Sequence, residues 1–247
     1  MQPKARVEVC VDSVESALAA QAGGAHRVEL CAALIEGGTT PSTGAIELAR
    51  RSLQIDLNVI VRPRAGDFCY SDLELEVMQR DIAAAKALGV NGVVIGILKE
   101  DGAIDVERTR RLADAARPMS VTFHRAFDMS RDPHEALEAL VALGIDRVLT
   151  KGQEDSIWEG LDLVARLVAQ AGERIIVMPG GGRERNVRAV VERTGAREIH
   201  VVGTQIVESR MLHRNLRLSM GGAVRPPEFS WAATDPARIR AILDALR

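Results

Sequence analysis

The chain has 247 residues, of which 47% are hydrophobic, 27% charged and 3% aromatic, a composition typical of a globular protein with one large domain or two ordinary ones. Its 32 basic and 34 acidic residues leave a net charge of −2, which excludes a general attraction for nucleic acid or for an anionic membrane. The apolar runs are too short for membrane-spanning helices, and three cysteines do not make a disulfide framework, so the sequence predicts a cytoplasmic protein.

Short runs of β-branched and aliphatic residues alternate with stretches rich in Ala, Leu, Glu and Arg along the whole chain. This alternation predicts strands and helices in turn. The predicted strands are residues 6–11, 27–31, 56–62, 92–98, 120–126, 146–151, 174–179 and 198–203. The predicted helices are residues 13–23, 44–52, 72–88, 105–116, 133–143, 155–171 and 186–194. Residues 205–218 are predicted to be helical as part of the eighth unit, and residues 235–246 to form a closing helix.

A strand followed by a helix, repeated eight times, predicts a TIM-type (β/α)8 barrel with parallel strands and right-handed crossovers. The alternative, an open doubly wound sheet, usually carries a glycine-rich fingerprint after its first strand. Here the segment VDSVES follows that strand, so the barrel is favoured. Because no linker or shift in composition interrupts the chain, residues 1–247 are predicted to form a single domain, with residues 205–247 as an irregular closing segment.

Two similar stretches, VEVCV and VELC, place a glutamate and a cysteine on the same face of each of the first two strands. Alternate residues of a barrel strand face the interior, so Glu8, Cys10, Glu29 and Cys31 are predicted to point inward. The same alternation adds Asn58, Ile60, Arg62, Thr122, His124 and His200. This polar interior predicts a functional pocket at the carboxyl ends of the strands, or else buried polar pairs such as Glu8 or Glu29 with Arg62.

Two glycine-rich segments follow the last two strands. The segment MPGGG contains Gly180, Gly181 and Gly182, and VVGT contains Gly203. In phosphate-binding barrels the corresponding loops present backbone N–H groups to an anion, and glycine allows a close approach. These glycines therefore predict a phosphate or carboxylate site, although they would also suit tight turns alone.

The loop RPRAGDFCYS after the third strand carries two arginines that could grip an anionic ligand. Arg62 and Arg64 could equally pair with acidic residues such as Asp67. The long segment CAALIEGGTTPSTG after the second strand is suited to covering the mouth of the barrel.

The segment TFHRAFD ends the fifth strand and brings Thr122, His124 and Arg125 to the same mouth. A histidine there could act as a general acid or base, because its usual pKa lies near neutrality. It could also be a hydrogen-bonded core residue without a chemical role.

The longest motifs resemble those of the CutC family, which is named for copper homeostasis in bacteria. They are VEVCV, GAHRVELCAALIEGGTTPSTG, IVRPRAGDFCYSDLE, GVVIGILKEDGAIDVERTRRL, PMSVTFHRAFDMSRDPHEAL, RVLTKGQ and IIVMPGGGRERNV. The resemblance covers residues 7 to 203 and implies a cytoplasmic barrel that forms homodimers or larger homo-oligomers and handles copper. The chain departs from the family motif LTSG by carrying Lys151 in place of the serine.

The first functional hypothesis is a copper-homeostasis protein that binds Cu(I) at the mouth of the barrel. Soft thiolates select Cu(I), and Cys10 and Cys31 lie at matching depth on adjacent strands. Cys69, on the next loop, could supply a third ligand. The opposing observation is that buried reduced cysteine is also a common inert core residue.

The second hypothesis is a barrel enzyme acting on a small anionic or phosphorylated substrate. Glu8, Glu29 and His124 would be its catalytic groups. The ligand would be bound by the glycine loops and by Arg62, Arg64, Asp67, Thr122, Arg125 and His200. The carboxylates distinguish the two hypotheses, because Cu(I) prefers soft ligands to carboxylates, whereas acid–base chemistry uses carboxylates. A third possibility is a barrel without activity of its own that acts through protein partners.

Overall fold

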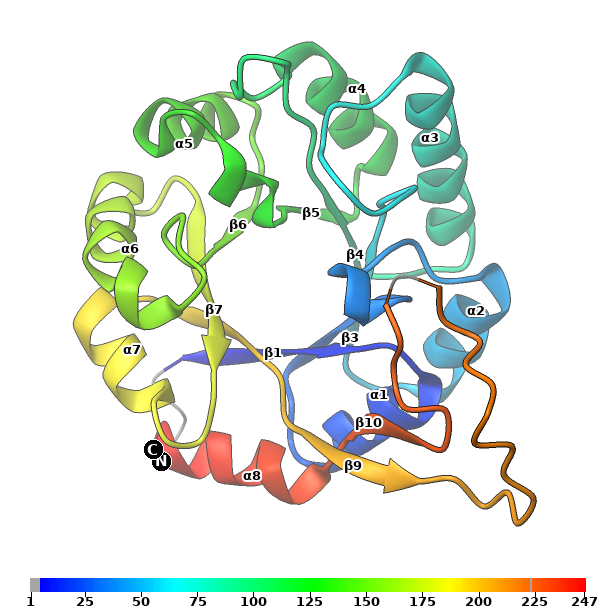
Figure 1. The fold of residues 1–247 in the computed structure, drawn as a ribbon. Coiled ribbons are helices and arrows are strands. Elements are labelled where there is room, and N and C mark those ends of the chain that lie inside the picture. Colours follow the sequence, from blue (N-terminus) through cyan, green and yellow to red (C-terminus); the bar gives the residue numbers. More distant parts are fainter. Residues whose placement is uncertain (1–4, 223) are drawn as a thin grey trace.

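The computed structural model describes residues 5–222 and 224–247 and contains a closed barrel of eight parallel strands (Figure 1). The strands are β1 (Arg6–Val11), β2 (Arg27–Leu30), β3 (Asp56–Ile60), β4 (Gly92–Ile95), β5 (Ser120–Phe123), β6 (Arg147–Thr150), β7 (Ile176–Gly182) and β8 (Glu198–Val201). The helices outside them are α1 (Val14–Ala22), α2 (Thr43–Ser52), α3 (Asp72–Ala87), α4 (Val106–Ala116), α5 (Pro133–Ala142), α6 (Ile157–Ala171) and α7 (Val187–Thr194). The predicted TIM barrel is confirmed.

All the α-helices except α7 begin after a residue whose side chain accepts a hydrogen bond from the first turn. Ser13 caps α1, and Ser71 caps α3 in a reciprocal arrangement with Glu74. Asp132 caps α5, with Pro133 at its first position, as the sequence indicates. Helix α6 is capped by Ser156, one residue beyond the start predicted for it.

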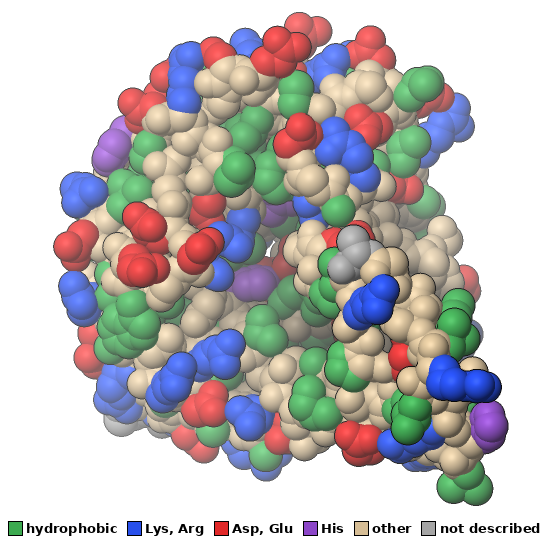
Figure 2. All heavy atoms as spheres, in the orientation of Figure 1, with side chains coloured by type: hydrophobic (Ala, Val, Ile, Leu, Met, Phe, Trp, Pro, Cys, Tyr) green, Lys and Arg blue, Asp and Glu red, His purple; other side chains and the backbone are tan. Residues whose placement is uncertain are grey.

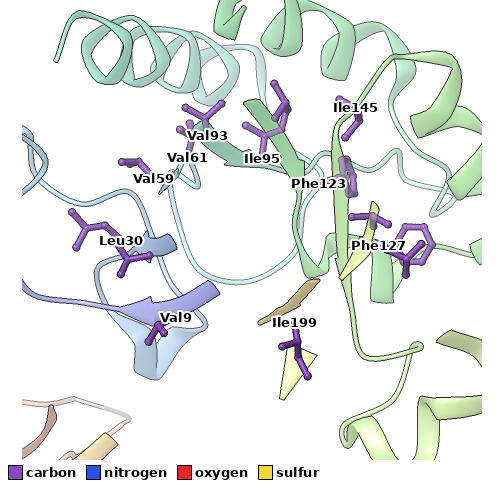
Figure 3. Close-up of a cluster of buried hydrophobic side chains, with 14 of the residues drawn as sticks. Val9, Leu30, Val59, Val61, Val93, Ile95, Phe123, Phe127, Ile145 and Ile199 are labelled. Carbon is purple, nitrogen blue, oxygen red and sulfur yellow. The ribbon is translucent and has the colours of Figure 1, made fainter. Parts of the chain in front are cut away.

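The aliphatic face of each strand packs against the surrounding helices. Val9, Leu30, Val59 and Ile199 are fully buried, and Figure 3 shows them distributed around the barrel wall with Phe123. Each such side chain contributes about 1.5–3 kcal/mol to folding through burial. With one set of strand residues used in this way, the alternate set is left to fill the barrel interior.

The predicted helix at 205–218 is wrong. Residues Thr204–Glu208 form strand β9, which pairs antiparallel with β10 (Ser230–Thr234). β10 packs beside α1, and β9 and the chain between the two strands, described at 209–222 and 224–229, form an arm on that side of the barrel (Figure 1). The β-branched residues of TQIV favour a strand, and the partner that stabilises it lies more than twenty residues away.

The predicted closing helix is present as α8 (Pro236–Ala245), which packs against α1 and α7. No helix formed by residues 5–222 and 224–247 is long and apolar enough to cross a membrane. A further boundary differs from the prediction: residues 180–182 continue strand β7 instead of forming a loop, and the pairing with β8 shifts register between Gly180 and Gly182.

Candidate functional site

A cavity of about 270 Å³ opens at the carboxyl ends of the strands. Strands β1, β2 and β8 contribute Cys10, Glu29 and His200 to its lining, and His124 follows β5. Figure 2 shows the corresponding hollow at the centre of the barrel, with acidic, basic and histidine side chains around it. Its position matches the place where barrel proteins build their functional sites.

Two thiols lie together in this cavity. The sulfur atoms of Cys10 and Cys31 are 3.8 Å apart, and both side chains are buried against Ile60 and Val94. The hydrogen bond from Cys31 lowers the pKa of Cys10 despite its burial, and the contact with His200 lowers it further. The same contact with Cys10, together with burial, raises the pKa of Cys31 well above its usual value. Cys10 is therefore the more acidic thiol of the pair.

His200 connects the thiols to a carboxylate. Its Nε2 atom lies 2.8 Å from Glu29 Oε2 and 4.0 Å from Glu8 Oε1. Burial opposes a charge on this ring, but hydrogen bonds with Cys10 and Glu29 raise its pKa well above the usual value. The arrangement places Cys10, His200 and Glu29 in series. Two overlapping sets could hold a metal ion, Cys10 with Glu29 and Cys31, and Glu8 with Glu29 and His200.

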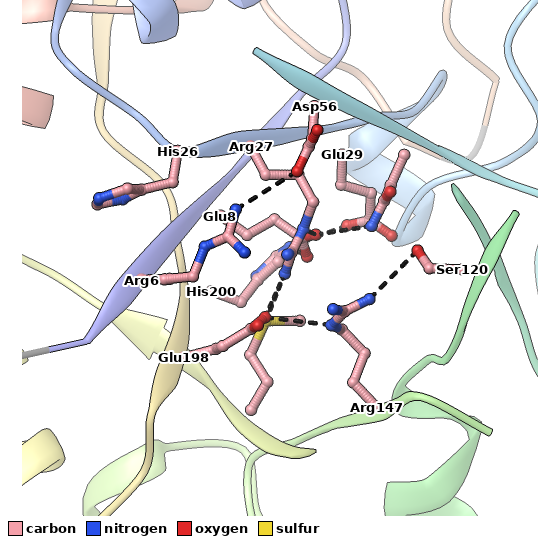
Figure 4. A network of polar contacts seen from close by, with 12 residues as sticks. Arg6, Glu8, His26, Arg27, Glu29, Asp56, Ser120, Arg147, Glu198 and His200 are labelled. Atoms are coloured by element: carbon pink, nitrogen blue, oxygen red, sulfur yellow. Dashed lines mark hydrogen bonds and ion pairs between the residues drawn. The ribbon is translucent and has the colours of Figure 1, made fainter. Parts of the chain in front are cut away.

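A layer of ion pairs fills the barrel below these groups (Figure 4). The Arg27 guanidinium lies between Glu8, which it contacts through Nε, and Glu198 Oε2, 2.5 Å from Nη2. Arg147 Nε contacts the same Glu198 oxygen at 3.1 Å, and Asn58 Nδ2 donates to Glu8 at 3.1 Å. Positive and negative groups thus alternate in a region that is closed to solvent, which is how buried charges are tolerated.

The predicted pairing of Arg62 with Glu8 or Glu29 is wrong. Arg62 follows β3 at the mouth, so its guanidinium reaches the covering loops and not the deeper layer of Glu8. Its Nη atoms donate to backbone carbonyls of the surrounding loops, those of Glu36 at 2.9 Å, Gly38 at 2.8 Å and Gly66 at 3.0 Å. Arg27 takes the pairing that the sequence indicated for Arg62.

Arg64 and Asp67 lie outside the cavity. They pair with each other at 3.0 Å on the surface, and Arg64 also contacts Glu74 at 2.5 Å. By contrast, Arg125 lines the cavity, and its charge is balanced by Asp128 at 2.7 Å.

His124 is a neutral group in the cavity wall. Its Nδ1 atom accepts a hydrogen bond from the Ala126 backbone N–H at 3.1 Å, so the proton of the neutral ring is on Nε2. Burial, and secondarily the charge of Arg62, lowers the pKa of His124 to about 3. At neutral pH this ring is therefore a hydrogen-bond donor through Nε2 and not a general base. Thr122 lies on β5, two residues before His124. Its Oγ1 atom is buried without a hydrogen-bond partner among the described residues.

The four glycines predicted to bind an anion do not line this cavity. A Cβ atom on Gly203 would lie 2.5 Å from Ile239 of α8, and one on Gly182 would lie 2.8 Å from Ile199, so close packing already accounts for both. Gly180 and Gly181 lie beside the aliphatic chain of Lys151, whose ammonium group donates to the Asp155 carbonyl. Anion binding by these glycines stays a prediction.

Several residues of the interior were missed by the sequence reasoning. Arg27 shares the parity of Glu29 on β2, and Glu198 shares that of His200 on β8, so strand alternation could have identified both. Phe68, which lines the cavity and packs its ring against His124 with centroids 5.1 Å apart, belongs to a loop and carries no such periodic signal.

The fold and site together define a parallel (β/α)8-barrel protein with a buried thiol, imidazole and carboxylate cluster at its carboxyl-end mouth. A model of the CutC family matches residues 5–205. A human relative named copper homeostasis protein cutC homolog is 50% identical over 96% of this chain and 87% of its own length. A CutC family protein of Parabacteroides distasonis is 49% identical over 96% of this chain and 98% of its own. The chain belongs to the CutC family.

Solved structures agree with this assignment. A CutC structure from Streptococcus agalactiae superposes with a TM-score of 0.77 and 36% identity, covering 80% of this chain and 98% of that one. Phosphoribosylanthranilate isomerase from Thermotoga maritima superposes with a TM-score of 0.57 and 13% identity, covering 98% of each chain. At that identity the second likeness shows the shared barrel fold alone.

Proposed function

We propose that this protein takes part in copper homeostasis by binding Cu(I) between Cys10 and Cys31. The observation that carries the proposal is the 3.8 Å separation of two buried sulfur atoms at the mouth of the barrel. Thiolates are the ligands that select Cu(I) over harder metal ions. The names of the relatives support the same role, since the human homologue is called a copper homeostasis protein.

The separation of the sulfurs favours a bent site with a third ligand. If each Cu–S bond resembles the Zn–S bond of about 2.3 Å, a linear site would place the sulfurs about 4.6 Å apart, about 0.8 Å more than observed. A bent arrangement does not require the two sulfur atoms to move apart. We assign the third position to His200, because it contacts Cys10 and because imidazole suits copper better than the carboxylate of Glu29. Glu29 is the group that already lies within 4.8 Å of both sulfurs, so the His200 ring has to shift towards Cys31 on binding.

Copper binding at this site releases protons. In the free protein the thiol of Cys31 and the ring of His200 both hold protons, since their pKa values are raised. Both protons must leave before the groups can bind the metal. The affinity for Cu(I) is therefore expected to fall as the pH decreases, and Glu29 is placed to receive the proton from His200.

An anaerobic titration of Cu(I) against a chromophoric chelator such as bicinchoninate tests the proposal. The changes Cys10→Ser and Cys31→Ser should each lower the affinity at least about 100-fold, since even residues behind the ligands alter affinity by about 10–100-fold. The double change should add little more, because one site needs both sulfurs. Cys69→Ser is the matched control, since Cys69 is free and exposed outside the cavity. A double variant that binds Cu(I) as tightly as the wild type would reject the site.

The alternative, an enzyme that uses Glu8 and His124 for acid–base chemistry, has weaker support. Glu8 is held by Arg27, and His124 stays neutral with its proton on Nε2. Only Glu29 and His200 keep the contacts expected of a proton-transfer pair.

We also propose that the protein is cytoplasmic and forms homo-oligomers through its arm. Three free cysteines suit a reducing compartment. The arm exposes large apolar side chains, namely Ile206, Leu212, Leu216, Met220 and Trp231. Residues 205–231 carry four arginines and two glutamates, a net charge of +2, which leaves −4 for the rest of the chain. A basic, apolar arm therefore complements the body of a second copy.

A further inference from the structure

The cavity at the mouth contains a buried cation without a counter-charge. Arg62 is 5% exposed and lines the cavity, and its guanidinium donates to neutral backbone carbonyls, lies over the Phe68 ring and forms no ion pair with a described residue. The nearby Tyr70 hydroxyl carries no charge either, because burial raises its pKa to about 12. An isolated buried charge is costly unless an opposite charge accompanies it. The site is thus electrostatically suited to an anion.

The other charged groups of the cavity are already balanced. Arg125 pairs with Asp128 at 2.7 Å, and the His200 ring contacts the Glu29 carboxylate at 2.8 Å. Glu36 is exposed, and its carboxylate forms no ion pair with Arg62. Only its backbone carbonyl accepts a hydrogen bond from Arg62. The surplus positive charge therefore belongs to Arg62.

Two donors of this cavity have no acceptor among the described residues. They are Arg62 Nε and His124 Nε2, each in a side chain more than nine-tenths buried. His124 must present an N–H group there, because its Nδ1 atom is occupied by the Ala126 backbone donor. Buried donors are normally satisfied, so two unsatisfied donors in side chains that line one cavity, both closed to solvent in the free protein, indicate a ligand with acceptor oxygens.

Phe68 fixes both donors in place. Its ring packs against His124 with centroids 5.1 Å apart, and the Arg62 guanidinium carbon lies 5.2 Å from its centre. Phe68, Ile60 and Leu149 also give the cavity apolar walls. Such walls accept a short carbon chain and are unfavourable for a fully hydrated ion such as phosphate.

We infer that this cavity binds a small monocarboxylic acid, whose carboxylate accepts hydrogen bonds from Arg62 Nε and His124 Nε2 while its short carbon chain lies against Phe68. The two oxygens of a carboxylate match two fixed donors, and its charge neutralises Arg62. This site uses groups other than the thiol pair, so it holds whether or not Cys10 and Cys31 bind copper.

Calorimetric titration of the full-length protein under reducing conditions tests the inference, with acetate, propionate and phosphate as probes at matched ionic strength. Acetate and propionate should bind saturably with one site per chain, and phosphate more weakly. Arg62→Lys keeps the charge but loses the Nε donor, and His124→Phe removes the second donor. Each change should raise the dissociation constant about 10–100-fold, the usual effect of losing a hydrogen bond to a charged group.

Two controls separate this site from other effects. Arg64→Met removes an exposed arginine of the same loop that has its own carboxylate partners, and it should change the dissociation constant by less than about twofold. The double Cys10→Ser, Cys31→Ser variant should still bind propionate, which distinguishes failure of this site from failure of the copper site.

A crystal structure with propionate supplies the second measurement, independent of variants that fold poorly. Density for a carboxylate within hydrogen-bond distance of Arg62 Nε and His124 Nε2 is the expected result. The inference is overturned if wild-type protein shows no saturable carboxylate binding, if phosphate binds more tightly, or if only water occupies this position at saturating propionate.

Discussion

Arg27 and Arg62 are both buried arginines, but their charges are balanced in different ways. Arg27 lies between the carboxylates of Glu8 and Glu198. Arg62 donates to neutral carbonyls and forms no ion pair with a described residue. The first arrangement is complete within the chain and has a structural role, whereas the second leaves a charge for a ligand to neutralise.

Removal of Arg27 is expected to destabilise the barrel strongly. Arg27→Met leaves the buried Glu8 without a cation and Glu198 with Arg147 alone, and breaking a buried pair costs about 3–5 kcal/mol. Urea-induced unfolding measures this loss. Arg193→Met is the matched control, because Arg193 forms an exposed pair with Asp162 and should change the unfolding free energy by less than about 1 kcal/mol. Equal effects of the two changes would contradict the structural role of Arg27.

His124 is expected to make the protein sensitive to acid. Its pKa is about 3 in the folded chain, below the usual value of about 6.5 in the unfolded chain. Below pH 6.5 the unfolded state therefore binds a proton at His124 that the folded state does not bind. The free energy of unfolding decreases as the pH falls. Between pH 6.5 and 4.5 this histidine alone should lower the unfolding free energy by about 2–3 kcal/mol.

Unfolding measured at both pH values in the wild type and in His124→Phe isolates this effect. The variant should lose about 2–3 kcal/mol less than the wild type over the same interval. His134→Gln is the control, because it removes an exposed histidine instead of a buried one. A His124→Phe protein with the wild-type pH dependence would show that the ring is not held neutral.

At the scale of elements, helix α8 closes the barrel through contacts that only glycine allows. A Cβ atom on Gly23, at the end of α1, would lie 2.6 Å from the Ile239 Cβ and 2.8 Å from the Pro236 carbonyl oxygen. Gly203, after β8, meets the same Ile239 side chain. The carbonyl belongs to the backbone and cannot rotate away, so α8 would have to move to admit a methyl group.

Gly23→Ala should therefore destabilise the protein by about 1–3 kcal/mol, as overpacking does in well-packed interiors. Gly44→Ala is the control, because nothing lies within 4 Å of a Cβ there and alanine favours the helix α2 in which Gly44 lies. That change should be neutral or stabilising by up to about 1 kcal/mol. Thermal and urea unfolding compare the two, and a harmless Gly23→Ala would mean that α8 docks loosely.

At the scale of the whole molecule, the arm lies outside the barrel and leaves large apolar side chains exposed. Its strands pair only with each other, and Leu212 is completely exposed. Apolar side chains displayed in this way are typical of surfaces that bind another protein. A second copy of the chain is the partner that its charge favours.

The wild type is accordingly expected to be a dimer or larger at micromolar concentration, and Leu212→Ser combined with Trp231→Ser is expected to shift it to monomer. Light scattering after gel filtration measures the mass. Leu73→Ser, which removes an exposed leucine of α3 away from the arm, should leave the mass unchanged. A monomeric wild type would contradict self-association through the arm.

The sequence by itself determined the barrel and the inward direction of its polar residues. Eight repeated units predict the fold, and the period of two in a strand places Glu8 and Cys10 on one face without knowledge of their neighbours. Both are properties of local backbone geometry. The placement of Cys10 and Cys31 on adjacent strands follows from the same reasoning, because consecutive parallel units are neighbours in the barrel.

Only the tertiary structure decided which groups meet. Glu8 pairs with Arg27 and not with Arg62. The strand register places Arg27 beside Glu8 in the barrel, whereas Arg62 lies higher, at the mouth. The donor state of His124 depends on the Ala126 backbone N–H, and β9 depends on a strand far along the chain. Contacts of this kind are fixed by distances in space between strands and loops, which periodicity along the chain does not encode.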